Sequence, residues 1–175
     1  KKKKNLEKHG SDSPRLDTEV LLAHARNCER IRLYTNYEDV VTEQERALMR
    51  QLVQRRANSE PVAYLVGNRE FFGLDFYVDK NVLVPRPDTE TLVIELVDEA
   101  QKLTNPFILD LCTGSGCIAI SAAANCHNAK FQATDISEPA LAIAQKNAAS
   151  NELSNQIQFL LSDGFEQIPP GTLFA

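Results

Sequence analysis

Apolar residues follow helical spacing in the first part of this chain. One periodic segment begins at Ser13-Pro14, and a serine followed by proline is typical of the start of a helix. A second segment opens at Thr42, and Glu45 three residues later completes a capping-box pattern. We therefore expect residues 1–67 to form a small helical bundle.

The next segment is short and rich in aromatic residues. Its pattern predicts two strands, one within residues 71–78 and one at Val82–Val84, joined by a turn at Asp79–Asn81. We interpret residues 68–87 as a β-hairpin linker. Asp88 is then expected to cap a helix whose apolar residues recur every three or four positions.

From residue 106 onward, strands and helices alternate. The expected strands are Phe107–Leu111, Lys130–Thr134 and Ile157–Leu161. Helices are expected between them, from about Ser115 to Asn125 and after the capping residue Ser137. This alternation predicts an α/β fold, in which residues 88–175 form the βαβαβ half of a doubly wound parallel sheet.

Composition and charge narrow the class of protein. Of the 175 residues, 43% are hydrophobic and 25% charged, which is typical of a globular chain. No segment has the roughly 18 consecutive apolar residues of a membrane span, and no secretion signal is evident, so we expect a cytoplasmic location. Residues 1–69 carry 14 basic and 10 acidic groups, whereas residues 70–175 carry 5 and 14. The acidic half disfavours direct nucleic-acid binding, and nothing in the sequence indicates an obligate oligomer rather than a monomer.

The four cysteines form no Cys-x-x-Cys pair. We interpret them as buried, reduced thiols in a reducing compartment, with metal binding or catalysis as alternatives; they are Cys28, Cys112, Cys117 and Cys126. The three histidines are scattered along the chain, so no metal site is expected.

A glycine-containing stretch from Asp110 to Gly116 lies where a strand ends and a helix begins. Gly114 and Gly116 allow a sharp turn and a close approach of the backbone to a ligand, and the helix N-terminus offers free N–H groups. Asp135 ends the next strand, where a carboxylate can accept hydrogen bonds from both hydroxyls of a ribose.

Asp110 bears on the kind of ligand. The sequence from Gly114 to Ala119 formally matches a dinucleotide fingerprint. A carboxylate at position 110 would repel a pyrophosphate and would suit an ammonium group, such as that of S-adenosylmethionine. The alternative is that Asp110 caps the helix or orders the loop.

The end of the third strand borders the same crevice in a doubly wound sheet. There Asp163 is predicted to bind the amine of adenine, with Gly164 and Phe165 lining the slot for the ring; the alternative is an ordinary turn. The expected cofactor-binding residues are Asp110, Cys112, Thr113, Gly114, Ser115, Gly116, Asp135, Ile136, Asp163 and Gly164.

Several stretches together resemble the HemK/PrmC family, the N5-glutamine methyltransferases of peptide-chain release factors. The matching segments are Gly67–Leu74, Val82–Glu90 with its Pro-Arg-Pro sequence, Asp110–Gly116 with Asp135, and the helical start around residues 13–17. The resemblance implies a class I methyltransferase sheet, S-adenosylmethionine as cofactor and a release factor as substrate. It also implies that residues 1–67 recognise the substrate protein.

Two features depart from the family pattern. Cys112 stands where the family usually has glycine, and the family's Asn-Pro-Pro-Tyr motif, which grips the glutamine amide, does not occur in the sequence. We therefore expect a fragment whose catalytic residues lie beyond Ala175 and which is inactive by itself. Arg86 and Thr89 are candidate substrate-side residues, with structural roles as the alternative. Two other functions stay open: a nucleic-acid methyltransferase that shares the cofactor half, and a non-catalytic dinucleotide-binding module.

Overall fold

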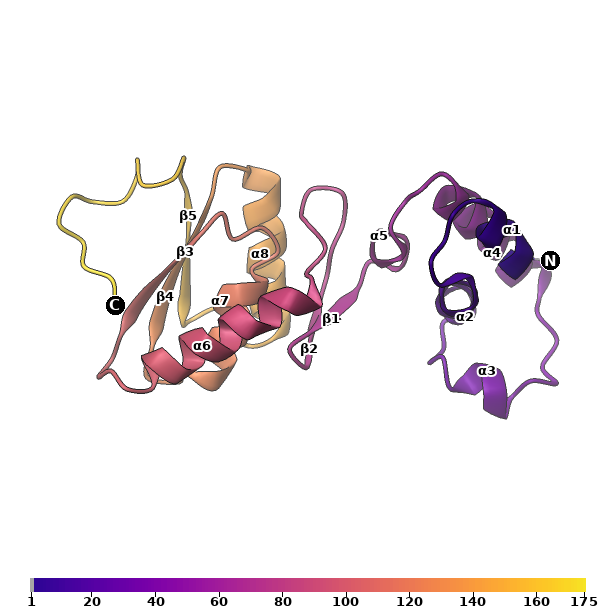
Figure 1. Ribbon diagram of the computed structural model, residues 1–175, viewed down its shortest axis with the longest axis horizontal. Helices are drawn as coiled ribbons and strands as arrows, with labels where there is room; N and C mark the ends of the chain where they lie inside the picture. Colours follow the sequence, from indigo (N-terminus) through magenta and orange to yellow (C-terminus); the bar gives the residue numbers. More distant parts are fainter. Residues whose placement is uncertain (1) are drawn as a thin grey trace. The chain divides into compact units, whose positions relative to one another are not determined.

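The computed structural model describes residues 2–175, which divide into two compact units after Gly67 (Figure 1). No helix within residues 2–175 is long and apolar enough to cross a membrane.

The first unit is helical. Its helices are α1 (Lys2–Lys8), α2 (Pro14–Ala25), α3 (Arg32–Thr35), α4 (Glu43–Ala57) and α5 (Val62–Val66). The predicted capping box of α4 is confirmed: the Glu45 N–H donates to the Thr42 hydroxyl at 3.2 Å, and the Thr42 N–H donates to the Glu45 carboxylate at 2.6 Å. Pro14 occupies the first turn of α2, but the Ser13 side chain makes no capping bond.

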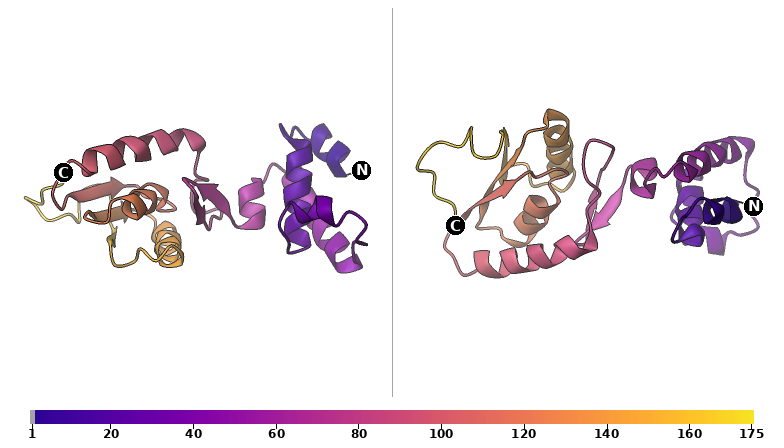
Figure 2. Two further views of the ribbon diagram at one scale, coloured as in Figure 1. Left: turned by 90° about the horizontal axis from the view of Figure 1, so that it is seen from below. Right: turned by 45° about the horizontal axis from the view of Figure 1, so that its top comes forward.

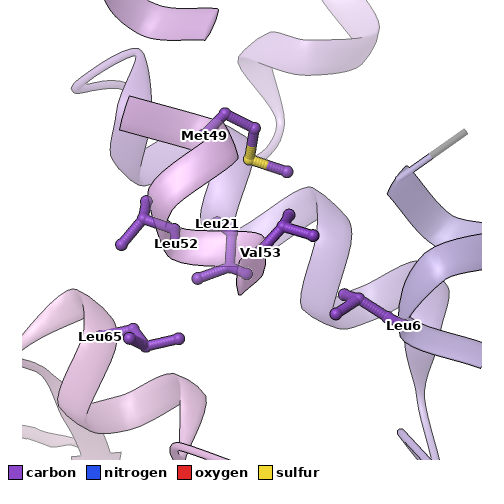
Figure 3. Packing of buried hydrophobic residues seen from close by; sticks show 6 residues of the cluster. All are labelled: Leu6, Leu21, Met49, Leu52, Val53 and Leu65. Atoms are coloured by element: carbon purple, nitrogen blue, oxygen red, sulfur yellow. The ribbon is translucent and has the colours of Figure 1, made fainter. Parts of the chain in front are cut away.

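Apolar side chains from four of these helices meet in one core (Figure 3). The buried members of the cluster are Leu6, Leu21, Met49, Leu52, Val53 and Leu65. Full burial of each such side chain stabilises the fold by about 1.5–3 kcal/mol. At the edge of this unit Asp17 accepts hydrogen bonds from Arg56 and from the Ser11 hydroxyl, both at 2.8 Å, which links α2 to α4.

The second unit opens with an antiparallel hairpin, β1 (Arg69–Phe71) and β2 (Leu74–Phe76). Its turn is Phe72-Gly73, whose φ angles of 52° and 74° are both left-handed, as in the type I′ turns common in two-residue hairpins. The prediction that a strand within residues 71–78 pairs with Val82–Val84 across a turn at Asp79–Asn81 was therefore wrong. Asp79 does form a turn, because its carboxylate accepts from the Asn81 N–H at 2.8 Å. Val82–Val84 follow as a segment that belongs to neither sheet and forms no strand.

The capping role predicted for Asp88 was also wrong. Asp88 lies inside a short 3₁₀ turn, η1 (Pro87–Thr89), and neither this turn nor α6 (Glu90–Ala100) has a side-chain cap. The proline at the first position of the turn fixes the local backbone instead. Figure 2 shows α6 running alongside the sheet that follows.

The three predicted parallel strands are confirmed as β3 (Phe107–Leu111), β4 (Lys130–Asp135) and β5 (Ile157–Leu161), in the order β3-β4-β5. They alternate with α7 (Cys117–Asn125) and α8 (Glu138–Ser150). The Ser137 hydroxyl accepts from the Ala140 N–H at 3.3 Å and caps α8 as predicted. The strand order advances in one direction, so right-handed crossovers place α7 and α8 on the same face of the sheet, where they contact each other.

Candidate functional site

A cavity of about 410 Å³ lies in the second unit, between the loop that follows β3 and the extended chain that leads into α6. Its lining comes from two segments: Leu83, Val84, Pro85, Arg86 and Thr89 on one side, and Cys112, Thr113, Gly114, Ser115, Cys117 and Ile118 on the other. The predicted substrate-side residues Arg86 and Thr89 therefore share one cavity with four of the predicted cofactor residues.

The loop after β3 turns through three left-handed residues, Cys112, Gly114 and Gly116, with φ angles of 59°, 57° and 80°. Its two glycines serve different purposes. A Cβ on Gly114 would meet nothing closer than the Cys112 carbonyl at 4.0 Å, so this position borders open space. A Cβ on Gly116 would lie 2.7 Å from Ile120 and 3.2 Å from Ala144, so this glycine permits close packing beneath the loop.

Asp135 ties the ends of two strands together. One of its carboxylate oxygens accepts from the Gly114 N–H and the other from the Ser137 N–H, each at 2.9 Å. The side chain is partly exposed, and each carboxylate oxygen has a further lone pair for a ligand hydroxyl.

Asp110 is held against the same loop. Its carboxylate accepts from the Thr113 hydroxyl at 2.7 Å, which is the loop-ordering contact considered as an alternative role for this residue. Burial raises the pKa of Asp110, and the nearby charge of Asp135 adds to this rise, while hydrogen bonds from Thr113 and the Ala119 N–H oppose it. Ionised Asp110 is therefore costly here and would be favoured by a cationic partner.

Six of the predicted cofactor residues do not line this cavity: Asp110, Gly116, Asp135, Ile136, Asp163 and Gly164. Ile136 and Asp163 are exposed, and Gly164 adopts a left-handed φ of 52° in the turn after β5. Ile136 directly follows Asp135, and the turn with Asp163 and Gly164 is joined to Asp135 through Ser162, whose N–H donates to the Asp135 carbonyl at 3.0 Å. The contact of Asp163 and Gly164 with adenine, and that of Ile136 with the cofactor, stay predictions.

The cysteines differ in exposure, and none forms a disulfide. Cys126 is buried, but Cys112 is exposed at the cavity, so the prediction of uniformly buried thiols was wrong. Burial raises the pKa of the Cys117 thiol. Within the described part of the chain, no group of three or more His, Cys, Asp or Glu side chains is placed to hold a metal ion.

Each of the two units matches a known protein family. Residues 2–67 match the family model of the PrmC N-terminal domain, and residues 87–171 match that of ribosomal protein L11 methyltransferase (PrmA). The chain is 48% identical over 171 residues to a release factor glutamine methyltransferase from Rhodopirellula baltica, which covers 95% of this chain and 58% of the relative. A protein of the same name from Koribacter versatilis is 42% identical over an alignment that covers 98% of this chain and 60% of that protein. The chain belongs to the HemK/PrmC family.

The chain spans about three fifths of the length of these HemK/PrmC relatives. Among solved structures, a SAM-dependent methyltransferase from Agrobacterium tumefaciens aligns with a TM-score of 0.50 at 18% identity, over 57% of this chain and 33% of that one. This likeness identifies the fold of the sheet-bearing unit. The matched PrmC domain ends at the residue where the helical unit ends.

One wall of the cavity and one residue behind it were not predicted from the sequence. Leu83, Val84 and Pro85 were interpreted as strand and linker, although they adjoin the Arg86 that was singled out. Asn147 lies beneath the loop in α8 and bonds to Ser115. An asparagine inside a predicted helix was the available signal, because asparagine is a poor helix former.

Proposed function

We propose that the protein transfers the methyl group of S-adenosylmethionine to the side-chain amide nitrogen of a glutamine in a peptide-chain release factor. The observation that carries this proposal is the joining of a PrmC N-terminal domain, at residues 2–67, to a methyltransferase half, at residues 87–171. The methyltransferase half alone is compatible with other substrates, since its matching model describes ribosomal protein L11 methyltransferases. The helical unit is what favours a release factor.

The residues present fit the cofactor. Gly114 borders open space at the cavity, so backbone can approach a ligand there. In the proposed complex, Asp135 accepts hydrogen bonds from the ribose hydroxyls, Asp110 faces the ammonium group and Asp163 binds the adenine amine. Bound S-adenosylmethionine supplies an activated methyl group on a sulfonium, whose leaving group is a neutral thioether, and so the transfer needs no metal.

The substrate glutamine presents a poor nucleophile, because the lone pair of an amide nitrogen is delocalised. Catalysis then consists largely of orientation, which holds the amide so that this lone pair faces the methyl group. We assign Arg86 and Thr89 to the substrate side, since they line the wall of the cavity that faces the loop after β3. The structural alternative for Arg86 is an ion pair with Glu90, but Arg86 is exposed and Glu90 accepts from the Phe72 N–H at 3.1 Å.

The helical unit is proposed to dock the release factor in the cytoplasm. Its charge differs in sign from that of the sheet-bearing part, with 14 basic and 10 acidic groups in residues 1–69 against 5 and 14 in residues 70–175. This difference in charge supports separate roles, in which the helical unit recognises the protein substrate and the sheet-bearing unit binds the cofactor.

The decisive experiment is a methyl-transfer assay with the natural protein at its full length. The protein is incubated with S-adenosylmethionine and a bacterial release factor, and the factor is mapped by peptide mass spectrometry. One added methyl group on a single glutamine is the expected result, and a release factor with that glutamine changed to asparagine is the control. In parallel, calorimetry compares S-adenosylhomocysteine with NAD. Binding of NAD alone would favour a dinucleotide-binding module and overturn the proposal.

A further inference from the structure

Asn147 of α8 is one of the largest fully buried side chains of the second unit, with 1% of its surface exposed. Its amide nitrogen donates to the Ser115 carbonyl at 2.9 Å and to the Tyr77 carbonyl at 3.0 Å. Its amide oxygen accepts from the Tyr77 N–H at 2.8 Å. Both donors and the acceptor of the amide are therefore used, on partners 32 and 70 positions away in the sequence.

We propose that Asn147 is a positioning residue for the cofactor loop, an inference that rests on the proposed function. Ser115 belongs to the stretch Thr113–Ser115 that lines the cavity. Tyr77 begins the chain that leads to the opposite wall at Leu83–Arg86. A single buried amide thus sets the loop after β3 against the chain that forms the other wall of the cavity.

The neighbouring contacts of α8 support this role. Ala144, three positions before Asn147 and so on the same face of the helix, lies directly beneath Gly116, where even a methyl group would be in close contact. Lys146 places its ammonium 3.2 Å from the centre of the Tyr77 ring. The loop after β3 and Tyr77 therefore both pack against one stretch of α8, and Asn147 bonds to both of them.

Few other side chains can make this set of bonds. A carboxamide offers two N–H donors and an acceptor, whereas an ionised aspartate is an acceptor only. Aspartate at position 147 would point one oxygen at two carbonyls. Protonation would restore one donor, and burial beside carbonyls raises the pKa of a carboxyl group. The aspartate variant therefore offers a pH-dependent probe of the proposed contact.

Asn151 provides a matched control. It lies one turn further along α8 and also reaches the hairpin, since its amide donates to the Asp75 carbonyl at 3.2 Å and to the Asn147 carbonyl at 2.9 Å. It has no bond to the loop after β3. Loss of Asn151 thus removes a tie between α8 and the hairpin without touching the cofactor loop.

The test compares Asn147→Ala, Asn147→Asp and Asn151→Ala with the unaltered full chain, after thermal unfolding has established the temperature range in which each variant is folded. Calorimetry then gives the Kd for S-adenosylhomocysteine. We expect Asn147→Ala to weaken binding about tenfold, or about 1.4 kcal/mol, and Asn151→Ala to leave it within about twofold of the unaltered chain, or about 0.4 kcal/mol. For Asn147→Asp, the ratio of its Kd to that of the unaltered chain should fall as the pH is lowered from about 8 to about 5.

Two outcomes separate this inference from the proposed function. If the unaltered chain binds S-adenosylhomocysteine while Asn147→Ala and Asn151→Ala weaken it equally, or if the Asn147→Asp ratio does not change with pH, the positioning role is overturned and the proposed function stands. If the unaltered chain does not bind S-adenosylhomocysteine, the cofactor assignment itself fails. Hydrogen exchange adds a readout that needs no ligand: the Tyr77 amide should be protected in the unaltered chain and exchange faster in Asn147→Ala.

Discussion

The Asp135 carboxylate accepts a hydrogen bond from the Gly114 N–H at 2.9 Å, across 21 positions of sequence. Because Asp135 ends β4 and Gly114 lies in the loop after β3, this bond joins the carboxyl ends of two parallel strands. The other oxygen accepts from the Ser137 N–H. The group proposed to bind the ribose is thus also the group that holds the glycine loop in place.

Changing Asp135 to alanine should therefore weaken cofactor binding for two reasons. It removes the proposed acceptor of the ribose hydroxyls, and it releases the Gly114 N–H. Loss of hydrogen bonds to a charged acceptor is expected to cost about 2–3 kcal/mol of binding free energy. Titration calorimetry with S-adenosylhomocysteine measures this loss of binding free energy.

Glu138→Ala is the control for the loss of one negative charge, because Glu138 is exposed in the first turn of α8, three positions away. Its affinity for S-adenosylhomocysteine should match that of the unaltered chain. Equal affinities for Asp135→Ala and Glu138→Ala would rule out the ribose-binding assignment.

The two glycines of the loop should respond differently to substitution. Gly116→Ala brings a methyl group within 2.7 Å of Ile120 at a φ of 80°, so we expect a loss of about 1–3 kcal/mol in the free energy of unfolding from overpacking. Gly114→Val places a branched side chain into open space beside the cavity at a φ of 57°, so its main effect should be loss of S-adenosylhomocysteine binding. Urea unfolding and calorimetry on both variants separate the two effects.

Gly73→Ala is the control for backbone strain alone, since Gly73 has a φ of 74° in the hairpin turn and no atom near its missing Cβ. It should lose about 1–2 kcal/mol of stability, the cost of a left-handed conformation, and keep its affinity. A Gly114→Val protein that folds and binds normally would show that this turn is not the cofactor loop.

Local sequence signals predicted the parallel sheet well and the hairpin badly. Phe107–Leu111 and Ile157–Leu161 are mostly apolar runs between turn residues, and such runs predict strands with little help from the rest of the fold. Val82–Val84 has the same local character, but Pro85 follows, and the segment belongs to neither sheet within residues 2–175. The true turn uses Phe72 at a φ of 52°, a conformation that bulky residues seldom adopt, and so the sequence did not reveal it.

The candidate site likewise combines features that local sequence signals reveal with features that depend on distant parts of the chain. The proximity of Asp110, Gly114 and Asp135 could be predicted because strand ends and glycine spacing are local features. Asn147 was missed because its role depends on partners 32 and 70 positions away. Only folding brings Tyr77, Ser115 and Asn147 together, and a pattern within one helix carries no record of that contact.

In the helical unit, Asp17→Ala should destabilise the fold. Asp17 is only 13% exposed, and it accepts from Arg56 and Ser11 at 2.8 Å. Its removal leaves a largely buried guanidinium without this partner, at a cost of about 1.5–3 kcal/mol. Arg46→Ala is the control, because Arg46 and Glu43 are 56% and 68% exposed and such a surface pair contributes about 0–1 kcal/mol. Equal urea midpoints for the two variants would contradict the prediction.

Asp110 should make stability depend on pH. Its pKa is raised in the folded state, mainly by burial, so just above the ordinary aspartate pKa of about 3.9 the folded chain binds more protons than the unfolded chain. Stability is then lost as the pH rises from that value through the folded pKa. Asp110→Asn removes this loss, so its advantage in the free energy of unfolding over the unaltered chain should grow across this window and level off above it. Urea unfolding at several pH values measures the difference, and an advantage that shrinks with rising pH would contradict it.

The same raised pKa predicts how cofactor binding depends on pH. If Asp110 faces the ammonium group of the ligand, binding favours the ionised carboxylate and lowers its pKa. Affinity for S-adenosylhomocysteine should then increase as the pH rises through the pKa of Asp110 in the free protein, with protons released on binding. Calorimetry in two buffers of different ionisation enthalpy counts those protons, and Asp110→Asn should release fewer of them and show a flatter pH profile. An unchanged profile in Asp110→Asn would mean that Asp110 only orders the loop through its 2.7 Å bond from Thr113.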